Sequence, residues 1–187
     1  MSGTIKKNGL TVHMAGERAE GSYIKMTLSM MEQFGIQTHK EGNKVIVPEN
    51  RSFGLTEYQI EPDVSGACYF YAMAPLLKTD VIVRDVHRNS LQGDIKFVEL
   101  TKELGCELQE NEKGLLVRGS HLAEYPGLTV SMKDFSDQTM TMAAIAPFAK
   151  DATLIQNVGH IRFQESDRIS AIVTELNRMG IVCEEVP

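Results

Sequence analysis

Apolar residues recur at helical spacing in three separate stretches of the chain, and each stretch ends at a glycine. Residues three or four positions apart lie on the same side of an α-helix, so this spacing predicts three amphipathic helices. A glycine directly after the last apolar residue favours the left-handed backbone that ends a helix. The chain is therefore predicted to repeat one helix-ending pattern, at Gly35, Gly105 and Gly180.

Turn-forming residues follow the first two of these glycines and predict β-hairpins. Segments 41–43 and 111–114 contain glycine, asparagine and charged residues. Each precedes a short apolar run, 44–47 in the first repeat and 115–117 in the second. Gly and Asn between two extended runs are typical of hairpin turns. Each of these two helices is thus expected to lead into a pair of antiparallel strands.

A second pair of helical stretches repeats as well. Segments 72–77 and 144–149 share the order Ala-x-Ala-Pro, and β-rich runs follow them at 80–86 and 153–158. Together with the hairpins, they predict a strand–helix–strand–helix–strand–strand unit (βαβαββ) of about seventy residues. We therefore expect an α/β (α+β) fold with mixed parallel and antiparallel sheets and helices on one face.

The unit boundaries suggest two regions. The sequence changes character at 57–63, after the first hairpin, which predicts a region 1–60 and a region 61–187. The first helix and hairpin lack the helix that would precede them, and the last unit stops at Pro187 before its final strand. We expect the chain to be a central piece: the last unit of one domain, then two units of another.

Composition narrows the class of protein. Hydrophobic residues make up 42% and charged residues 24%, as in soluble globular proteins. Together with the cysteines described below, this predicts a cytoplasmic protein. A net charge of −6 disfavours general nucleic-acid binding, which needs a basic face. The cysteines, Cys68, Cys106 and Cys183, are odd in number and widely spaced, which favours reduced thiols over disulfides or a zinc site. No apolar run is long enough to cross a membrane.

The segment 164–168, Gln-Glu-Ser-Asp-Arg, carries the clearest chemical signal. It is predicted to open an amphipathic helix directly after the strand-like run 154–158. The free N–H groups at a helix start favour a bound anion. There Glu165 would be an acid–base group and Arg168 a clamp on a phosphate or carboxylate. An exposed ion pair worth under about 1 kcal/mol remains the alternative.

Asp137 is the second candidate. Ser136 is a natural N-cap for a helix at 138–149, and a carboxylate in the first turn stays ionised beside the helix dipole. It is able to act as a general base, or it only caps the helix. His160 lies on the loop after the strand-like run, and Tyr23 begins the first helix. Each is a candidate ligand contact, with loop hydrogen bonding or packing as the alternative.

Four stretches together resemble the enolpyruvyl transferases, and among them the branch that acts on shikimate 3-phosphate. The resemblance covers essentially the whole chain in order. The run Glu-Ser-Asp-Arg, about thirty residues after the start of the Asp137 helix, is its most specific part. The stretches are 23–28 with 34–35, 61–70, 137–149, and 162–168 with 174–176.

The resemblance implies a fold and a reaction. The fold is an inside-out α/β barrel in which each of two domains contains three βαβαββ units. The reaction transfers the enolpyruvyl group of phosphoenolpyruvate to the 5-hydroxyl of shikimate 3-phosphate, without cofactor or metal, in a monomer. Asp137 matches the acid–base group at the 5-hydroxyl, Glu165 the proton-transfer group at the methylene, and Arg168 a phosphoenolpyruvate-binding arginine. Tyr23 and His160 match positions that line the shikimate 3-phosphate site.

The chain also departs from this family pattern. Gln164, a substrate-binding position, stands where a lysine is common, His160 replaces a usual asparagine, and Glu20 falls near a phosphate-binding serine. The family's terminal lysine and arginine segments, glycine-rich loop and Ser-Ser-Gln motif are missing. We therefore expect no activity from these residues alone. Two alternatives stay open: a related transferase acting on UDP-N-acetylglucosamine, or a non-catalytic βαβαββ module that binds a partner.

Overall fold

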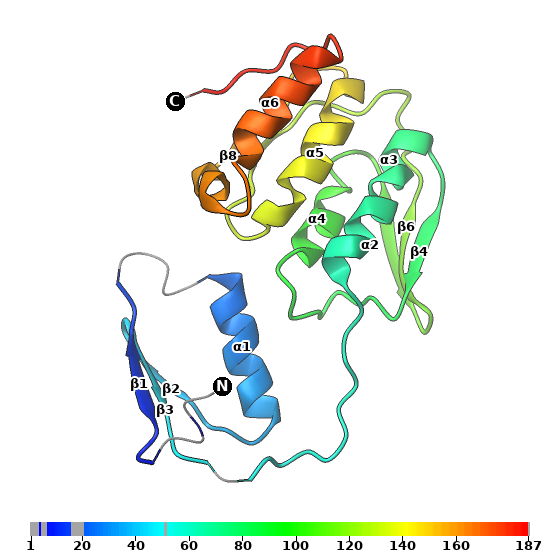
Figure 1. Ribbon diagram of the computed structural model, residues 1–187. Helices are drawn as coiled ribbons and strands as arrows, with labels where there is room; N and C mark the ends of the chain where they lie inside the picture. Colours follow the sequence, from blue (N-terminus) through cyan, green and yellow to red (C-terminus); the bar gives the residue numbers. More distant parts are fainter. Residues whose placement is uncertain (1–3, 5–6, 16–20, 51, 187) are drawn as a thin grey trace. The chain divides into compact units, whose positions relative to one another are not determined.

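A computed structural model describes residues 4, 7–15, 21–50 and 52–186 of the chain. These residues form two compact units, Met1–Ile60 and Glu61–Pro187, which we describe separately (Figure 1). The assignment of each unit to a particular repeat of the family's domains stays a prediction. Glu20 lies outside the described residues.

The first unit packs one helix against a small sheet. Its elements are β1 (Leu10–His13), α1 (Ser22–Gln33), β2 (His39–Glu41) and β3 (Lys44–Val47). The strands are antiparallel in the order β1-β3-β2, and β2 and β3 form the predicted hairpin. One side of the sheet and one side of α1 are apolar, so they bury each other. The core is small and consists of Met31, Ile36, Val45 and Val47.

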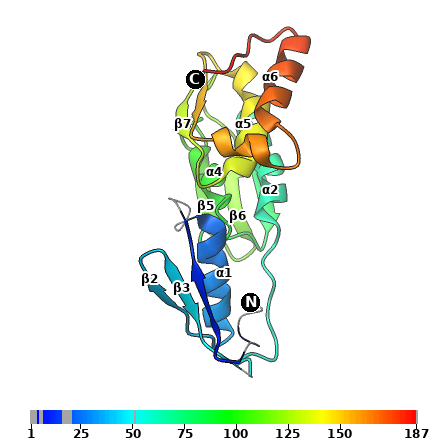
Figure 2. The same cartoon turned by 60° about the vertical axis from the view of Figure 1, so that its left-hand side comes forward.

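The second unit contains two separate sheets with helices between and beside them. β4, β6 and β5 form an antiparallel sheet, whereas β7 and β8 are parallel. Parallel and antiparallel pairs thus both occur, as predicted, but in different sheets of the described chain. Helices α5 and α6 lie side by side (Figures 1 and 2). The elements are α2 (Val64–Tyr71), α3 (Met73–Leu77), β4 (Val81–Arg84), α4 (Ile95–Leu100), β5 (Glu107–Asn111), β6 (Gly114–Arg118), β7 (Thr129–Ser131), η3 (Ser136–Gln138), α5 (Thr139–Ile145), η4 (Ala146–Phe148), β8 (Leu154–Gln156), η5 (Gly159–Phe163) and α6 (Arg168–Arg178).

The predicted repeat is visible in the strand pairing. Strand order β4-β6-β5 repeats β1-β3-β2. In the hairpins, His39 pairs with Ile46, and seventy positions further on Gln109 pairs with Leu116. The same register over the same offset means that the same side chains of each hairpin face the helix. A third copy begins with β7, α5, β8 and α6.

The repeated glycines adopt the predicted conformation. Gly35, Gly105 and Gly180 have φ angles of +81°, +84° and +83°. This is the left-handed region that glycine enters at little cost, so each glycine reverses the chain after its helix. The left-handed glycine is therefore confirmed at all three positions, but only α1 and α6 extend to it, because α4 ends at Leu100, five residues before Gly105.

The predicted helix 138–149 is wrong in its extent. The α-helix α5 covers only Thr139–Ile145, and the short 3₁₀ turns η3 and η4 flank it. Pro147 explains the later end, because proline has no N–H to donate and restricts the residue before it. The 3₁₀ turn at the start has consequences for the candidate site.

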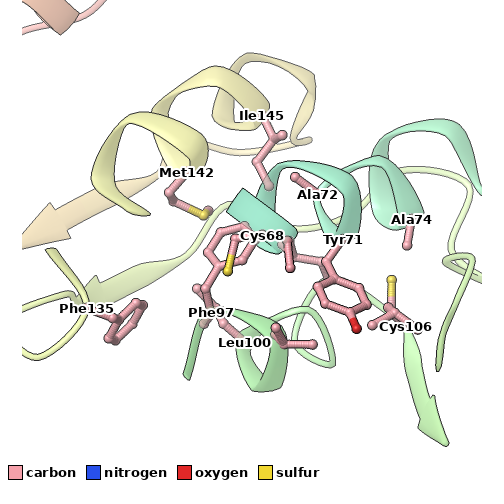
Figure 3. Packing of buried hydrophobic residues seen from close by; sticks show 14 of the residues in the cluster. Cys68, Tyr71, Ala72, Ala74, Phe97, Leu100, Cys106, Phe135, Met142 and Ile145 are labelled. Carbon is pink, nitrogen blue, oxygen red and sulfur yellow. The ribbon is translucent and has the colours of Figure 1, made fainter. Parts of the chain in front are cut away.

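One continuous core fills the second unit (Figure 3). Cys68, Tyr71 and Phe97 are fully buried at its centre. The Tyr71 hydroxyl donates to the Leu115 carbonyl oxygen at 2.8 Å, and burial raises the pKa of Tyr71 to about 12. Burial likewise raises the pKa of Cys106 to about 11, so that thiol is inert near neutral pH. No helix within the described residues has the length and apolarity to span a membrane.

Candidate active site

Helix α6 begins later than predicted. The strand β8 is followed by the 3₁₀ turn η5, and α6 starts at Arg168 with Asp167 as its N-cap. The Asp167 carboxylate accepts a hydrogen bond from the Ser170 N–H at 3.0 Å, and this bond, with a smaller contribution from Arg162, lowers the Asp167 pKa. Aspartate is among the best N-cap residues, which fixes the helix start here. Glu165 therefore precedes the helix instead of lying in its first turn.

Arg168 connects two carboxylates that are far apart in the sequence. Its Nη1 donates to Asp137 Oδ1 at 2.9 Å, and its Nη2 donates to Glu165 Oε2 at 2.8 Å. The Arg168 side chain is 17% exposed and that of Asp137 is 29% exposed, whereas that of Glu165 is 82% exposed. The guanidinium thus has an inner partner on η3 and an outer partner in solvent.

The two pKa shifts at this cluster follow from these contacts. Partial burial lowers the pKa of Arg168, but the hydrogen bonds to Glu165 and Asp137 outweigh it, and the net shift is upward. The pKa of Glu165 is lowered, first by its own backbone N–H and then by Arg168. Both groups are therefore charged over the neutral pH range.

Ser136 does not have the predicted capping role. It lies inside the turn η3, is buried, and its Oγ is 2.9 Å from Nε2 of His160. The Ser136 hydroxyl therefore contacts a residue of η5 and does not cap a helix. This contact brings the candidate His160 next to η3, so η3 carries groups that touch both His160 and Arg168. No sequence pattern indicated this contact, because serine before a helix usually indicates a cap.

The remaining candidates lie apart from these contacts. The side chain of Gln164 is exposed. Arg162 donates to Asp167 at 2.7 Å and also pairs with Glu185, so its charge serves the packing of α6. Tyr23 belongs to the first unit and is 61% exposed. The roles of all six predicted site residues stay predictions, but three of them, Asp137, Glu165 and Arg168, form one cluster.

The charge of the cluster limits what it can do. One guanidinium faces two carboxylates, so these three groups together carry a net negative charge. An incoming phosphate or carboxylate must displace one of the carboxylates from Arg168 or arrive with further cations. Among the described residues, no group of three or more His, Cys, Asp or Glu side chains is arranged to hold a metal ion.

Comparison with known proteins gives a consistent result. The family model for EPSP synthase (3-phosphoshikimate 1-carboxyvinyltransferase) matches residues 1–187. A 3-phosphoshikimate 1-carboxyvinyltransferase from Nostoc punctiforme is 39% identical over 167 residues, covering 89% of this chain and 39% of the relative. One from Syntrophobacter fumaroxidans is 34% identical over 179 residues, covering 95% and 42%. The chain spans about two fifths of the length of these relatives.

The fold comparison agrees with the predicted fold class. The solved structure of EPSP synthase from Acinetobacter baumannii superposes with a TM-score of 0.76 at 23% identity, covering 99% of this chain and 42% of that one. A second structure of the enzyme from that organism gives a TM-score of 0.72 at 21% identity. At this identity the likeness concerns the fold, and it confirms the predicted α/β architecture.

Proposed function

Because the chain belongs to the EPSP synthase family, we propose that it contributes to transfer of the enolpyruvyl group from phosphoenolpyruvate to the 5-hydroxyl of shikimate 3-phosphate. The observation that carries this proposal is the position of Arg168 between Asp137 and Glu165. Two carboxylates joined by one arginine suit a reaction on an anionic substrate that needs protons moved at two places. The family assignment does not favour a UDP-N-acetylglucosamine transferase or a non-catalytic module.

The proposed reaction assigns one proton transfer to each carboxylate. Glu165 enters the reaction in its protonated form, with the proton taken from water. Asp137 accepts the proton of the 5-hydroxyl as its oxygen bonds to C2 of phosphoenolpyruvate, and the methylene carbon C3 takes the proton of Glu165. The resulting tetrahedral intermediate then loses a proton from C3 to Glu165 while the C2–O bond to phosphate breaks. The products are the enol ether and inorganic phosphate, and both carboxylates return to their starting states once the Asp137 proton has left with phosphate.

Arg168 couples substrate binding to the acidity of Glu165 in this scheme. In the resting structure, the lowered pKa of Glu165 suits a proton acceptor better than a donor. When Arg168 turns towards the carboxylate of phosphoenolpyruvate, Glu165 loses that stabilising contact and its pKa rises. A larger fraction of Glu165 is then protonated, so a proton is available at the step in which C3 needs one.

The charges of the Asp137, Glu165 and Arg168 cluster predict that the 187 residues do not catalyse the reaction alone. The cluster has more negative than positive charge, and Gln164 adds none where the family commonly has a lysine. Charge stabilisation in such reactions depends on several groups acting together. Since the chain spans about two fifths of its relatives, we propose that cations outside it complete the site. His160 and Tyr23 would contact shikimate 3-phosphate, and Gln164 would lie beside phosphoenolpyruvate.

The proposal extends to setting and partners. The three cysteines are unpaired, which fits the reducing cytoplasm. The net charge of −6 fits small-molecule substrates and not nucleic acid. We propose a monomer that has these two substrates as its partners.

A pair of measurements on the 187-residue protein tests the proposal. Titration with shikimate 3-phosphate, followed by NMR, is expected to shift the signals of His160 and the η3 amides, and Asp137→Asn is expected to reduce these shifts. Lys133→Gln, on the preceding exposed turn, is the control that keeps them. Shikimate 3-phosphate at millimolar concentration that shifts none of these signals would support the non-catalytic module. Detectable product formation by the 187 residues alone would refute the incomplete site.

A further inference from the structure

The turn η3 presents three consecutive side chains to three different partners. Ser136 contacts His160, and Asp137 accepts from Arg168. Gln138, the next residue, is 1% exposed and points into the core of the unit. A 3₁₀ helix has about three residues per turn, so successive side chains project about 120° apart. The direction of one side chain therefore fixes the directions of the other two.

Gln138 is bonded at both ends of its amide. Its Nε2 donates to Asp94 Oδ2 at 3.0 Å and lies 3.4 Å from the Ser65 carbonyl oxygen. Its Oε1 accepts from the Thr141 hydroxyl at 2.9 Å. A fully bonded amide inside a core has one orientation, because any rotation leaves buried groups without partners. Gln138 is thus a rigid anchor for η3.

Asp94 accepts the hydrogen bond from Gln138, and its buried position is unusual for a carboxylate. It stands directly before α4, is 5% exposed, and does not cap that helix with its side chain. Its Oδ2 accepts instead from Ser65 on α2 and from Gln138. The carboxylate therefore links α2, α4 and η3. A buried carboxylate is costly unless it is hydrogen-bonded, so this position needs both donors.

We propose that Gln138, through its hydrogen bond to Asp94, is a positioning residue. It sets the orientation of η3 and so the contacts of Asp137 and Ser136. Gln138 touches no group that reacts in the proposed function. Its significance for catalysis rests on that proposed function. Its action on the geometry of η3 is a property of the resting protein. Removal of the Gln138–Asp94 bond turns η3 and loosens the contacts to Arg168 and His160 together.

The first test uses Gln138→Met, which keeps the length of the side chain and removes its amide. Amide hydrogen exchange reports on η3 directly, because the Gln138 N–H donates to the Phe135 carbonyl and the Thr139 N–H to the Ser136 carbonyl. We expect exchange at these two amides to accelerate by about tenfold or more. The side-chain NMR signals of His160 and Arg168 are expected to shift at the same time. A general loss of stability would not move these two signals in the folded protein.

The second test exchanges the two partners. Gln138→Glu alone places two carboxylates against each other, and it is expected to shift the His160 and Arg168 signals as Gln138→Met does. Asp94→Asn alone keeps an acceptor oxygen for Gln138 and is expected to have little effect. The double variant Asp94→Asn/Gln138→Glu restores a bond between an amide and a carboxylate, and we expect it to return the His160 and Arg168 signals towards those of the unsubstituted protein.

The control is Ser120→Ala, which removes a buried hydroxyl bonded to the Leu104 carbonyl at 2.7 Å, in the same unit but away from η3. The proposal is overturned if Gln138→Met moves the two signals no more than Ser120→Ala, or if the double variant fails to restore them. Should Gln138→Met not fold, the exchanged pair still decides. None of these measurements needs a substrate, so failure of the proposed function would appear separately, as an absence of ligand binding.

Discussion

The second and third repeats of the chain have a glycine with the same backbone angle after their helices but differ in what surrounds that glycine. After α4, the chain at Gly105 lies against Leu122 and Ser120, and the hairpin that follows completes a sheet. After α6, no atom of the described residues, apart from Gly180 and its two chain neighbours, lies within 4 Å of the place where a side chain at Gly180 would begin. No residue of α6 is fully buried, whereas α4 buries three of its six residues.

The two repeats thus differ in packing within the described residues. The second repeat is closely packed and supplies much of the core of its unit. In the described residues of the third repeat no hairpin follows α6, and Arg168 at its start pairs with a solvent-exposed carboxylate. The contrast can be tested by matched substitutions in the two repeats.

The largest effect is expected for the core of the second repeat. Phe97 is fully buried at the start of α4, so Phe97→Ala leaves a cavity and should lower the free energy of unfolding by about 3–5 kcal/mol. Phe163, just before α6, is 86% exposed, and Phe163→Ala should change it by less than about 0.5 kcal/mol. Urea unfolding followed by circular dichroism compares the two. Similar losses in both variants would remove the contrast.

Two glycines with nearly the same backbone angle give a second test of the contrast between the two repeats. At Gly105 a methyl group would lie 2.6 Å from Leu122 Cγ, so Gly105→Ala adds a steric clash to the cost of the left-handed backbone. We expect a loss of about 2–4 kcal/mol there. Gly180→Ala has only the backbone cost, about 1 kcal/mol. Equal losses in the same unfolding experiment would show that packing around Gly105 is unimportant.

A smaller effect is expected for the arginines of α6. Arg168→Ala removes one partner of the half-buried Asp137 and should cost about 1–2 kcal/mol. Arg178, 71% exposed at the other end of the helix, pairs only with Glu175 in the described contacts, and Arg178→Ala should cost less than about 0.5 kcal/mol. The comparison fails if Arg178→Ala is the more damaging change.

The smallest expected effect is on pH dependence. The folded pKa of Glu165 lies below its unfolded value, so its contribution to stability is present above the unfolded pKa and is lost as the pH falls through the folded pKa. A carbon-detected NMR titration should give a Glu165 midpoint below about 4.3, the ordinary glutamate value. Arg168→Ala should raise the midpoint only in part, because the first cause of the shift is the backbone N–H of Glu165 itself.

Much of the fold was predictable because its signals are local. Apolar spacing, the glycines and the hairpin turns each act through neighbouring residues, and they predicted the three amphipathic helices and both hairpins. The elements β1, α2 and β7 were not predicted at their residues. The extents of the helices at 138–149 and 164–168 were wrong, since a proline and an aspartate cap decided them. In both places the observed α-helix is shorter than predicted, because the sequence there contains more than one signal that starts or ends a helix.

The site was predictable only in its residue types. Spacing indicated Glu165 and Arg168 as neighbours, but the pairing of Arg168 with Asp137 spans thirty-one positions and depends on how α5 and α6 pack. The roles of Ser136 and Asp94 were missed because serine and aspartate before a helix ordinarily cap it. Here the hydroxyl contacts His160 and the carboxylate contacts Gln138. Such contacts arise from tertiary packing, and no local pattern encodes them.

The central claim is that Arg168 is the anion-binding group of an enolpyruvyl transfer site, and titration with phosphoenolpyruvate tests it most directly. We predict that millimolar phosphoenolpyruvate shifts the side-chain NMR signal of Arg168 and raises the titration midpoint of Glu165, with the signal of Arg178 unchanged. Arg168→Ala should abolish the rise of the Glu165 midpoint. Phosphoenolpyruvate that shifts Arg168 and Arg178 alike, or leaves the Glu165 midpoint in place, would contradict the claim.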